Sequence, residues 1–234
     1  MSHSGLIALV GSGEYLDVMR DIDLELIDGQ PPVTVQIATA AVPDGEKRLS
    51  YWRDLGRRHG ESLGLEVRDA TVYDRDEAND PRWDEILSGV GLIYLSGGNP
   101  AFLASTLAHT TLWRAIEREW RAGASLAGCS AGAMALCGRV PVLRGNGEYV
   151  DGCGILPSWR IIPHFDVFRD RYPAMMRDSL AHLEPDTTVI GIDEETALIG
   201  RPGDLWRVAG HGFVTVVNDE RVLAAGASVD LHRS

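Results

Sequence analysis

The sequence predicts an α/β protein with a doubly wound, mostly parallel sheet flanked by helices and an antiparallel hairpin near the C-terminus. Apolar runs without alternating polar residues are typical of strands buried on both faces, as in a parallel sheet. Such runs occur at residues 6–11, 33–38, 65–72, 91–96 and 125–128. Helical segments separate them, and this order favours right-handed crossovers and ligand binding beyond the carboxyl ends of the strands.

Two intervening segments are long enough to be crossover helices, at residues 46–60 and 111–122. Each places apolar side chains along one stripe, as expected of a helix that packs on a sheet. The stripes consist of Leu49, Trp52 and Leu55 in the first segment and of Leu112, Ile116 and Trp120 in the second.

The pattern changes after Val140, where glycine and proline interrupt short extended pieces. A helix is predicted near residues 169–183, and strands are predicted at residues 188–192, 205–209 and 212–217. Turn-forming residues at 200–204 and a second hairpin at 217–222 indicate that the last strands are antiparallel.

Length and composition predict one globular domain over residues 1–234. Single α/β domains of roughly 200–250 residues are common. Hydrophobic residues make up 44% of the chain, enough for a sizeable core. No run approaches the ~18 apolar residues that a membrane span requires, and the N-terminus has no basic region followed by an apolar one. We therefore expect a cytoplasmic protein with no membrane partner.

The net charge and the spacing of cysteines and histidines argue against a nucleic-acid-binding protein and against a metal-dependent one. The chain has 22 basic and 34 acidic side chains, a net charge of −12, which repels a phosphate backbone and argues against a nucleic-acid partner. Cys129, Cys137 and Cys153 lack metal-ligand spacing and fit reduced thiols, and the histidines form no metal-binding motif. We expect neither a metal nor another cofactor.

The strongest chemical signal is the segment 128–132, Gly-Cys-Ser-Ala-Gly, which follows a predicted strand and precedes helix-forming residues. A serine on so sharp a turn projects its hydroxyl into the cleft, and small flanking residues let strand and helix approach. Ser130 is therefore the candidate nucleophile, and the N–H of Ala131 would face an oxyanion. The alternative is a tight turn with an ordinary serine.

A second turn, Ser-Gly-Gly-Asn-Pro at residues 96–100, also joins a strand to an apolar helix. The N–H of Gly98 is the candidate second oxyanion donor. The alternative is a capping turn in which Asn99 caps the helix and Pro100 occupies its first turn, and both interpretations can hold. Asn99 is also a candidate substrate contact.

A serine nucleophile needs a base, and His164 at the end of an apolar extended run is the best candidate. A core histidine is the alternative, and His211 is the reserve choice for the base. Three acids follow a buried run at residues 193–195, but the local sequence does not choose among them. Along the chain the order is serine, histidine, acid. This order differs from that in α/β-hydrolases and from the two orders familiar in serine proteases.

The chain resembles the S51 serine peptidases of the class I glutamine-amidotransferase-like superfamily, the group that contains aspartyl dipeptidase and cyanophycinase. The resemblance spans about residues 5–218 and rests on segments 11–14, 97–99, 128–133, 163–165 and 191–197. It implies Ser130 as nucleophile, His164 as general base and Glu194 as the acid that holds the imidazole tautomer. It also implies that Gly98 and Ala131 supply the oxyanion N–H groups.

One departure from the family concerns Pro100 and Pro163, which stand where cyanophycinases carry glutamine. Proline offers no side-chain hydrogen bond, which argues against recognition of β-aspartyl-arginine. Arg169 and Arg171 follow His164 and could meet a substrate carboxylate, but equally could be solvated helix charges.

The function predicted from these residues is hydrolysis of short peptides or small amides through a Ser-His-Glu triad and an acyl-enzyme, by an exopeptidase or dipeptidase. The alternative is a non-catalytic small-molecule binding or stress-related protein on the same scaffold, because a fold does not establish a function. The sequence leaves the choice between a monomer and a homodimer open.

Overall fold

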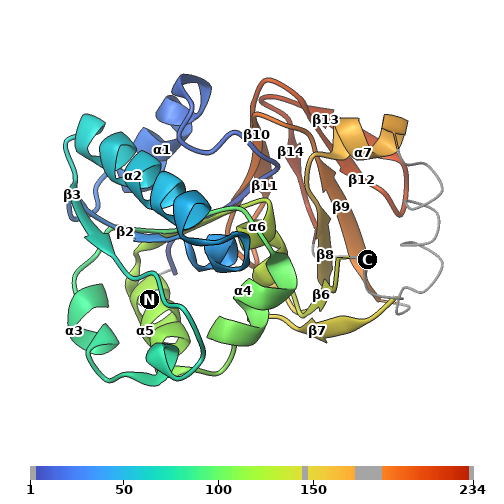
Figure 1. Cartoon of the computed structure of the whole chain (residues 1–234). Coiled ribbons are helices and arrows are strands. Elements are labelled where there is room, and N and C mark those ends of the chain that lie inside the picture. The colour runs from blue at the N-terminus through green and yellow to red at the C-terminus, as the bar shows by residue number, and fades with distance from the viewer. Residues whose placement is uncertain (1–3, 144–146, 172–185, 232–234) are drawn as a thin grey trace.

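The structure is a computed structural model that describes residues 4–143, 147–171 and 186–231. Its central sheet, as far as the chain is described, has eight strands (Figure 1). In spatial order these are β14 (Ser228–Val229), β11 (Trp206–Gly210), β10 (Thr196–Gly200), β1 (Ile7–Val10), β5 (Ser125–Cys129), β4 (Leu92–Leu95), β2 (Val33–Ile37) and β3 (Glu66–Asp69). The strands from β1 to β3 are parallel, whereas β10 pairs antiparallel with β1. The predicted α/β class with a mostly parallel sheet is confirmed.

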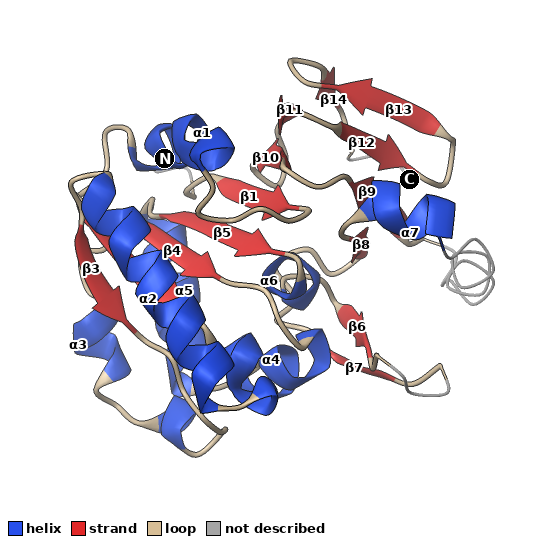
Figure 2. Cartoon of the chain, turned by 45° about the horizontal axis from the view of Figure 1, so that its top comes forward, coloured by secondary structure: helices blue, strands red, loops and turns tan. Residues whose placement is uncertain are grey.

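A second sheet lies beside the first, with α7 next to it (Figure 2). It consists of β13 (Arg221–Ala224), β12 (Phe213–Val216), β9 (Thr188–Ile192) and β8 (Trp159–Ile162). Strands β8 and β9 are parallel, and β12 and β13 form the predicted C-terminal hairpin. A short ribbon pairs β6 (Arg139–Pro141) with β7 (Tyr149–Asp151). The chain passes from the second sheet to the first between β9 and β10.

Helices cover both faces of the central sheet (Figure 1). They are α1 (Arg20–Ile27), α2 (Glu46–Ser62), α3 (Trp83–Leu87), α4 (Pro100–Leu107), α5 (Thr111–Ala122), α6 (Ala131–Ala135) and α7 (Phe165–Arg171). Alternate side chains of a strand point to opposite faces. Leu9 therefore packs in the cluster that contains α4 and α5 residues, whereas Val10 packs with Ile22 and Leu26 of α1. Burial of all residues of β1, β4 and β5 confirms the expected two-sided core.

Three local expectations need correction. The run at 65–72 was expected to be buried on both faces, but β3 is an edge strand with Glu66 and Asp69 exposed, because it has one strand neighbour only. Strand β10 was missed. The helix predicted near 169–183 begins earlier, at Phe165, and residues 172–183 lie outside the described residues. No helix within the described ranges is long and apolar enough to cross a membrane.

Candidate active site

Ser130 occupies the sharp turn between β5 and α6, with φ 49° and ψ −107°. Such a backbone conformation is unusual for a residue with a side chain and is held by its surroundings. A Cβ on Gly128 would lie 2.6 Å from the carbonyl carbon of Gly132, and a Cβ on Gly132 would lie 2.2 Å from the carbonyl oxygen of Leu95. Both flanking glycines are therefore required by close packing, as the sequence motif indicated.

The turn between β4 and α4 lies against the Ser130 turn, since a Cβ on Gly97 would approach the Cβ of Ser130 to 3.5 Å. Gly98 has φ 143°, and a side chain there would meet the carbonyl oxygen of Ala40 at 2.3 Å. Within the described chain, the N–H groups of Gly98 and Ala131 donate to no other group. Two backbone donors are thus left for a ligand beside Ser130.

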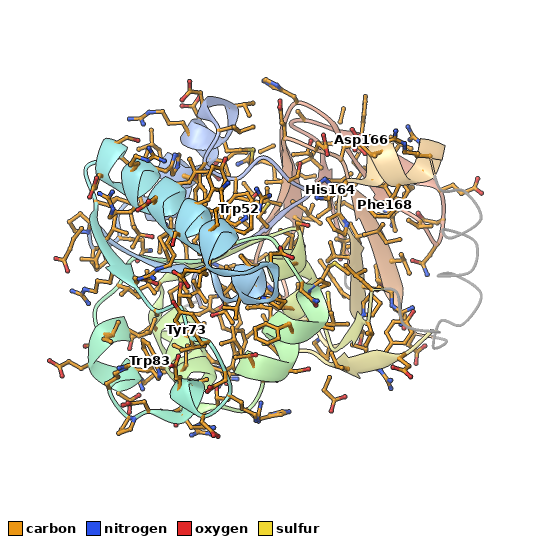
Figure 3. All side chains as sticks on the ribbon, in the orientation of Figure 1. Trp52, Tyr73, Trp83, His164, Asp166 and Phe168 are labelled. Atoms are coloured by element: carbon orange, nitrogen blue, oxygen red, sulfur yellow. The ribbon has the colours of Figure 1, made fainter. Side chains whose placement is uncertain are left out.

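His164 follows β8 and directly precedes α7, at the end of that helix nearest the parallel sheet (Figure 3). Its φ is 48°, and its carbonyl oxygen accepts the N–H of Phe168 at 2.9 Å. Its Nε2 lies 3.2 Å from the hydroxyl oxygen of Ser130. The position of His164 directly before α7 thus places its imidazole beside a serine that lies 34 residues earlier in the chain.

Glu194 lies in the crossing between β9 and β10, and its Oε1 is 2.7 Å from Nδ1 of His164. Its own N–H donates to Oδ1 of Asp166 at 3.2 Å, which ties the crossing to α7. Asp166 contributes to this arrangement but was not singled out from the sequence, because an acid in the first turn of a helix is common.

The two neighbouring acids point elsewhere. Asp193 is buried and accepts the N–H of Phe213 through Oδ2 at 3.0 Å, and burial raises its pKa. Glu195 has φ 52° and faces His211, with 3.5 Å between Oε2 and Nδ1. His211, the reserve candidate for the base, is thus placed beside Glu195, and its Nδ1 faces that acid.

Cys129 precedes Ser130 and is fully buried on the other side of the turn, among the residues that pack under α1 and α2. Its thiol donates to Oε2 of Glu14 at 2.8 Å. Burial, followed by the nearby Glu14, raises the pKa of the Cys129 thiol well above its usual value. The thiol is therefore kept protonated and away from solvent.

The two candidate substrate contacts have partners within the protein. Oδ1 of Asn99 accepts the N–H of Phe102 at 3.0 Å, so Asn99 caps α4, and Pro100 begins that helix as predicted. Arg169 is exposed on α7, with its guanidinium 5.9 Å from the ring centroid of Phe165. A substrate role for either residue stays a prediction. Across the described residues, no cluster of three or more His, Cys, Asp or Glu side chains could hold a metal ion.

A serine on a strained turn at the carboxyl edge of a helix-flanked parallel sheet, hydrogen-bonded to a histidine, is the arrangement of an α/β serine hydrolase. Comparison with known proteins gives the family. The model of peptidase family S51 matches residues 6–205. The chain belongs to peptidase family S51 and is a serine peptidase.

Individual relatives agree with this assignment. The cyanophycinases of Synechococcus elongatus and Thermosynechococcus vestitus are each 31% identical over 238 residues, covering 94% of this chain and 70% of theirs. The crystal structure of a peptidase from an acI-B1 actinobacterium is 40% identical, with a TM-score of 0.90 over 97% of both chains. A provisionally assigned peptidase E protein from Listeria monocytogenes EGD-e shares the fold, with a TM-score of 0.64 at 19% identity over 88% of this chain and 98% of its own.

Proposed function

We propose that this peptidase hydrolyses short peptides or small amides through a Ser130–His164–Glu194 triad and an acyl-enzyme. The observation that carries the proposal is the hydrogen-bonded chain from the Ser130 hydroxyl through His164 to Glu194, with separations of 3.2 Å and 2.7 Å. Such a chain is the geometric signature of an activated nucleophile: the nucleophile reaches a base, and a third group orients that base.

Each residue then has one task. Nδ1–H of His164 donates to Glu194, which leaves Nε2 to accept the proton of Ser130 while Oγ attacks the scissile carbonyl carbon. The tetrahedral intermediate collapses when His164 gives that proton to the leaving amine, and an acyl-enzyme remains. Water then attacks the acyl carbon, His164 accepts the proton of the water, and the same proton returns to Ser130 as the acid product departs.

The N–H groups of Gly98 and Ala131 stabilise the negative charge on the carbonyl oxygen. Their lack of an acceptor among the described residues and the contact between their two turns support this role. Loss of one such donor in other serine peptidases costs roughly 10²–10³ in kcat. The positive φ of Ser130 is the backbone conformation from which the next N–H can face the carbonyl oxygen that Ser130 attacks.

The family and an exposed arginine on α7 support the proposed substrate class. Relatives of this chain are named peptidase and cyanophycinase. We propose an exopeptidase or dipeptidase, with Asn99 at the oxyanion turn and Arg169 on α7 as candidate contacts for the substrate. Arg169 would meet a substrate carboxylate through its guanidinium.

The test is digestion of an unbiased dipeptide library, read by mass spectrometry, with wild type and Ser130→Ala compared. Hydrolysis by wild type alone is expected, and the products define the substrate. A fluorophosphonate probe separates this proposal from the non-catalytic alternative, since a binding protein leaves Ser130 unlabelled. Membership of a peptidase family argues against that alternative. An unlabelled wild type that cleaves no library member would overturn the proposal.

A further inference from the structure

Glu14 is a buried acid that the proposed mechanism does not use. It lies in the turn after β1, between Gly13 with φ 86° and Tyr15 with φ 67°, and only 6% of its surface is exposed. The residues directly before and after Glu14 thus both have positive φ, which gives this turn an irregular backbone path. A charged side chain is rarely buried without partners, so its contacts indicate why it is there.

Both carboxyl oxygens of Glu14 accept a hydrogen bond, and the two donors belong to the two turns of the active site. Oε1 accepts the N–H of Gly97 at 2.9 Å, and Oε2 accepts the thiol of Cys129 at 2.8 Å. Gly97 precedes the oxyanion donor Gly98, and Cys129 precedes the nucleophile Ser130. The side chain thus reaches from the end of β1 across β5 to the turn that follows β4.

The same turn also holds the segment that carries the acid of the triad. The carbonyl oxygen of Ser12 accepts the N–H of Glu195 at 3.1 Å. A Cβ on Gly11 would lie 2.1 Å from the carbonyl oxygen of Asp193, so the two backbones are in direct contact. The turn after β1 therefore touches both residues that flank Glu194 as well as both turns that flank the oxyanion site.

We propose that Glu14 is a positioning residue of the hydrolytic reaction, which fixes the oxyanion turn relative to Ser130. This inference rests on the proposed function. Because Oε1 accepts the N–H of Gly97, the Ser96–Gly97 peptide is fixed, and the next peptide, which carries the N–H of Gly98, is restrained with it. Because Oε2 holds Cys129, the same carboxyl group fixes the start of the Ser130 turn. A displacement of about 1 Å at such a site costs roughly 10²-fold in rate.

Glu14→Gln tests this role with little change in shape. A glutamine side chain has one acceptor oxygen and one amide donor, so it can retain only one of the two bonds and places a donor against the other. The expected result is a fall in kcat of roughly 10²-fold with KM little changed, because the oxyanion contact acts mainly in the transition state. The rate of fluorophosphonate labelling of Ser130 should fall in parallel.

Asp23→Asn is the matched control, because it makes the same acid-to-amide change at another buried carboxyl group. Asp23 is 2% exposed on α1, and its Oδ2 lies 2.8 Å from Nε2 of His59. This variant is expected to keep kcat, KM and the labelling rate close to wild type. Wild-type kinetics in folded Glu14→Gln, an effect on KM alone, or an equal loss of kcat in Asp23→Asn would each overturn the positioning role.

Circular dichroism and thermal melting establish that each variant is folded. If Glu14→Gln does not fold, kcat, KM and the labelling rate are measured on Glu14→Asp instead. This variant keeps the carboxyl group but shortens the side chain by one methylene, and the same loss of kcat is expected. If neither variant folds while Asp23→Asn does, Glu14 serves the stability of the fold, and the inference is overturned. A wild type that is neither labelled nor hydrolytic overturns the proposed function itself, which separates the two failures.

Discussion

Nδ1 of His164 lies 2.7 Å from Oε1 of Glu194, although 30 residues separate the two in the chain. The contact forms because β8 and β9 are parallel neighbours in the second sheet, so the residues that follow each strand meet at the same edge. Asp166 of α7 then binds the N–H of Glu194 and holds the acid beside the imidazole.

Replacing Glu194 by glutamine should preserve the fold and lower kcat by on the order of 10⁴-fold, as for the equivalent change in the serine-protease triad. The amide no longer selects the imidazole tautomer in which Nε2 accepts the serine proton. The measurement is kcat per folded molecule on the best dipeptide, with Glu195→Gln as the matched control because Glu195 faces His211 instead. A larger loss from Glu195→Gln or Asp193→Asn than from Glu194→Gln would contradict the assignment.

The covalent adduct of a fluorophosphonate should form on Ser130 and not on Cys129. A thiol is intrinsically the better nucleophile, but this one is buried, donates to Glu14 and has a raised pKa. Intact-protein mass spectrometry with peptide mapping on wild type, Cys129→Ala and Ser130→Ala is the measurement. Cys129→Ala should lose stability and part of kcat, because Glu14 loses its donor at the start of the Ser130 turn, but it should keep the adduct on Ser130. An adduct on Cys129, or full activity in Ser130→Ala, would refute the site.

Ser130→Ala and His164→Ala should be strongly non-additive. Their direct hydrogen bond at 3.2 Å makes them one unit, so removal of the hydroxyl leaves the base without a proton to accept. Adding His164→Ala to Ser130→Ala should therefore lower kcat little further. The measurement is a double-mutant cycle in kcat. Independent effects that multiply in the double variant would argue against a shared proton transfer.

Cyanophycin should be a poor substrate. Pro100 begins α4 and Pro163 precedes His164, and both are buried at positions where the family resemblance implies glutamine in cyanophycinases. A site without partners for a polar group of a substrate disfavours that substrate by roughly 10²-fold. The comparison is the rate of β-Asp-Arg release from cyanophycin against hydrolysis of the best dipeptide. Equal rates would show that recognition does not depend on these positions.

Cys129 and Cys137 should resist alkylation in the native protein at pH 8. Burial raises the pKa of Cys137 to about 12 and that of Cys129 well above its usual value, so neither supplies thiolate. Mass spectrometry after iodoacetamide should find these two thiols modified only after unfolding in guanidinium chloride. Rapid native modification of Cys129 would show that its thiol reaches solvent, and would reopen the choice of nucleophile.

The sequence by itself determined the features that depend on neighbours in the chain. Glycines two positions before and after Ser130, between an apolar run and helix-forming residues, define a strand–turn–helix unit. Asn99 and Pro100 likewise define the start of α4 by local capping chemistry. The parallel core followed from unbroken apolar runs, because strands with helices on both faces have no polar side.

Only the tertiary structure decided which distant groups meet. Asp193, Glu194 and Glu195 are indistinguishable as a run of acids, and the structure separates them because it turns one inward to Phe213, one to His164 and one to His211. It also placed β10 beside β1 and the carboxyl group of Glu14 between two turns. Local sequence specifies backbone geometry within a few residues, whereas these contacts depend on the order of strands in a sheet, which arises from the packing of the whole chain.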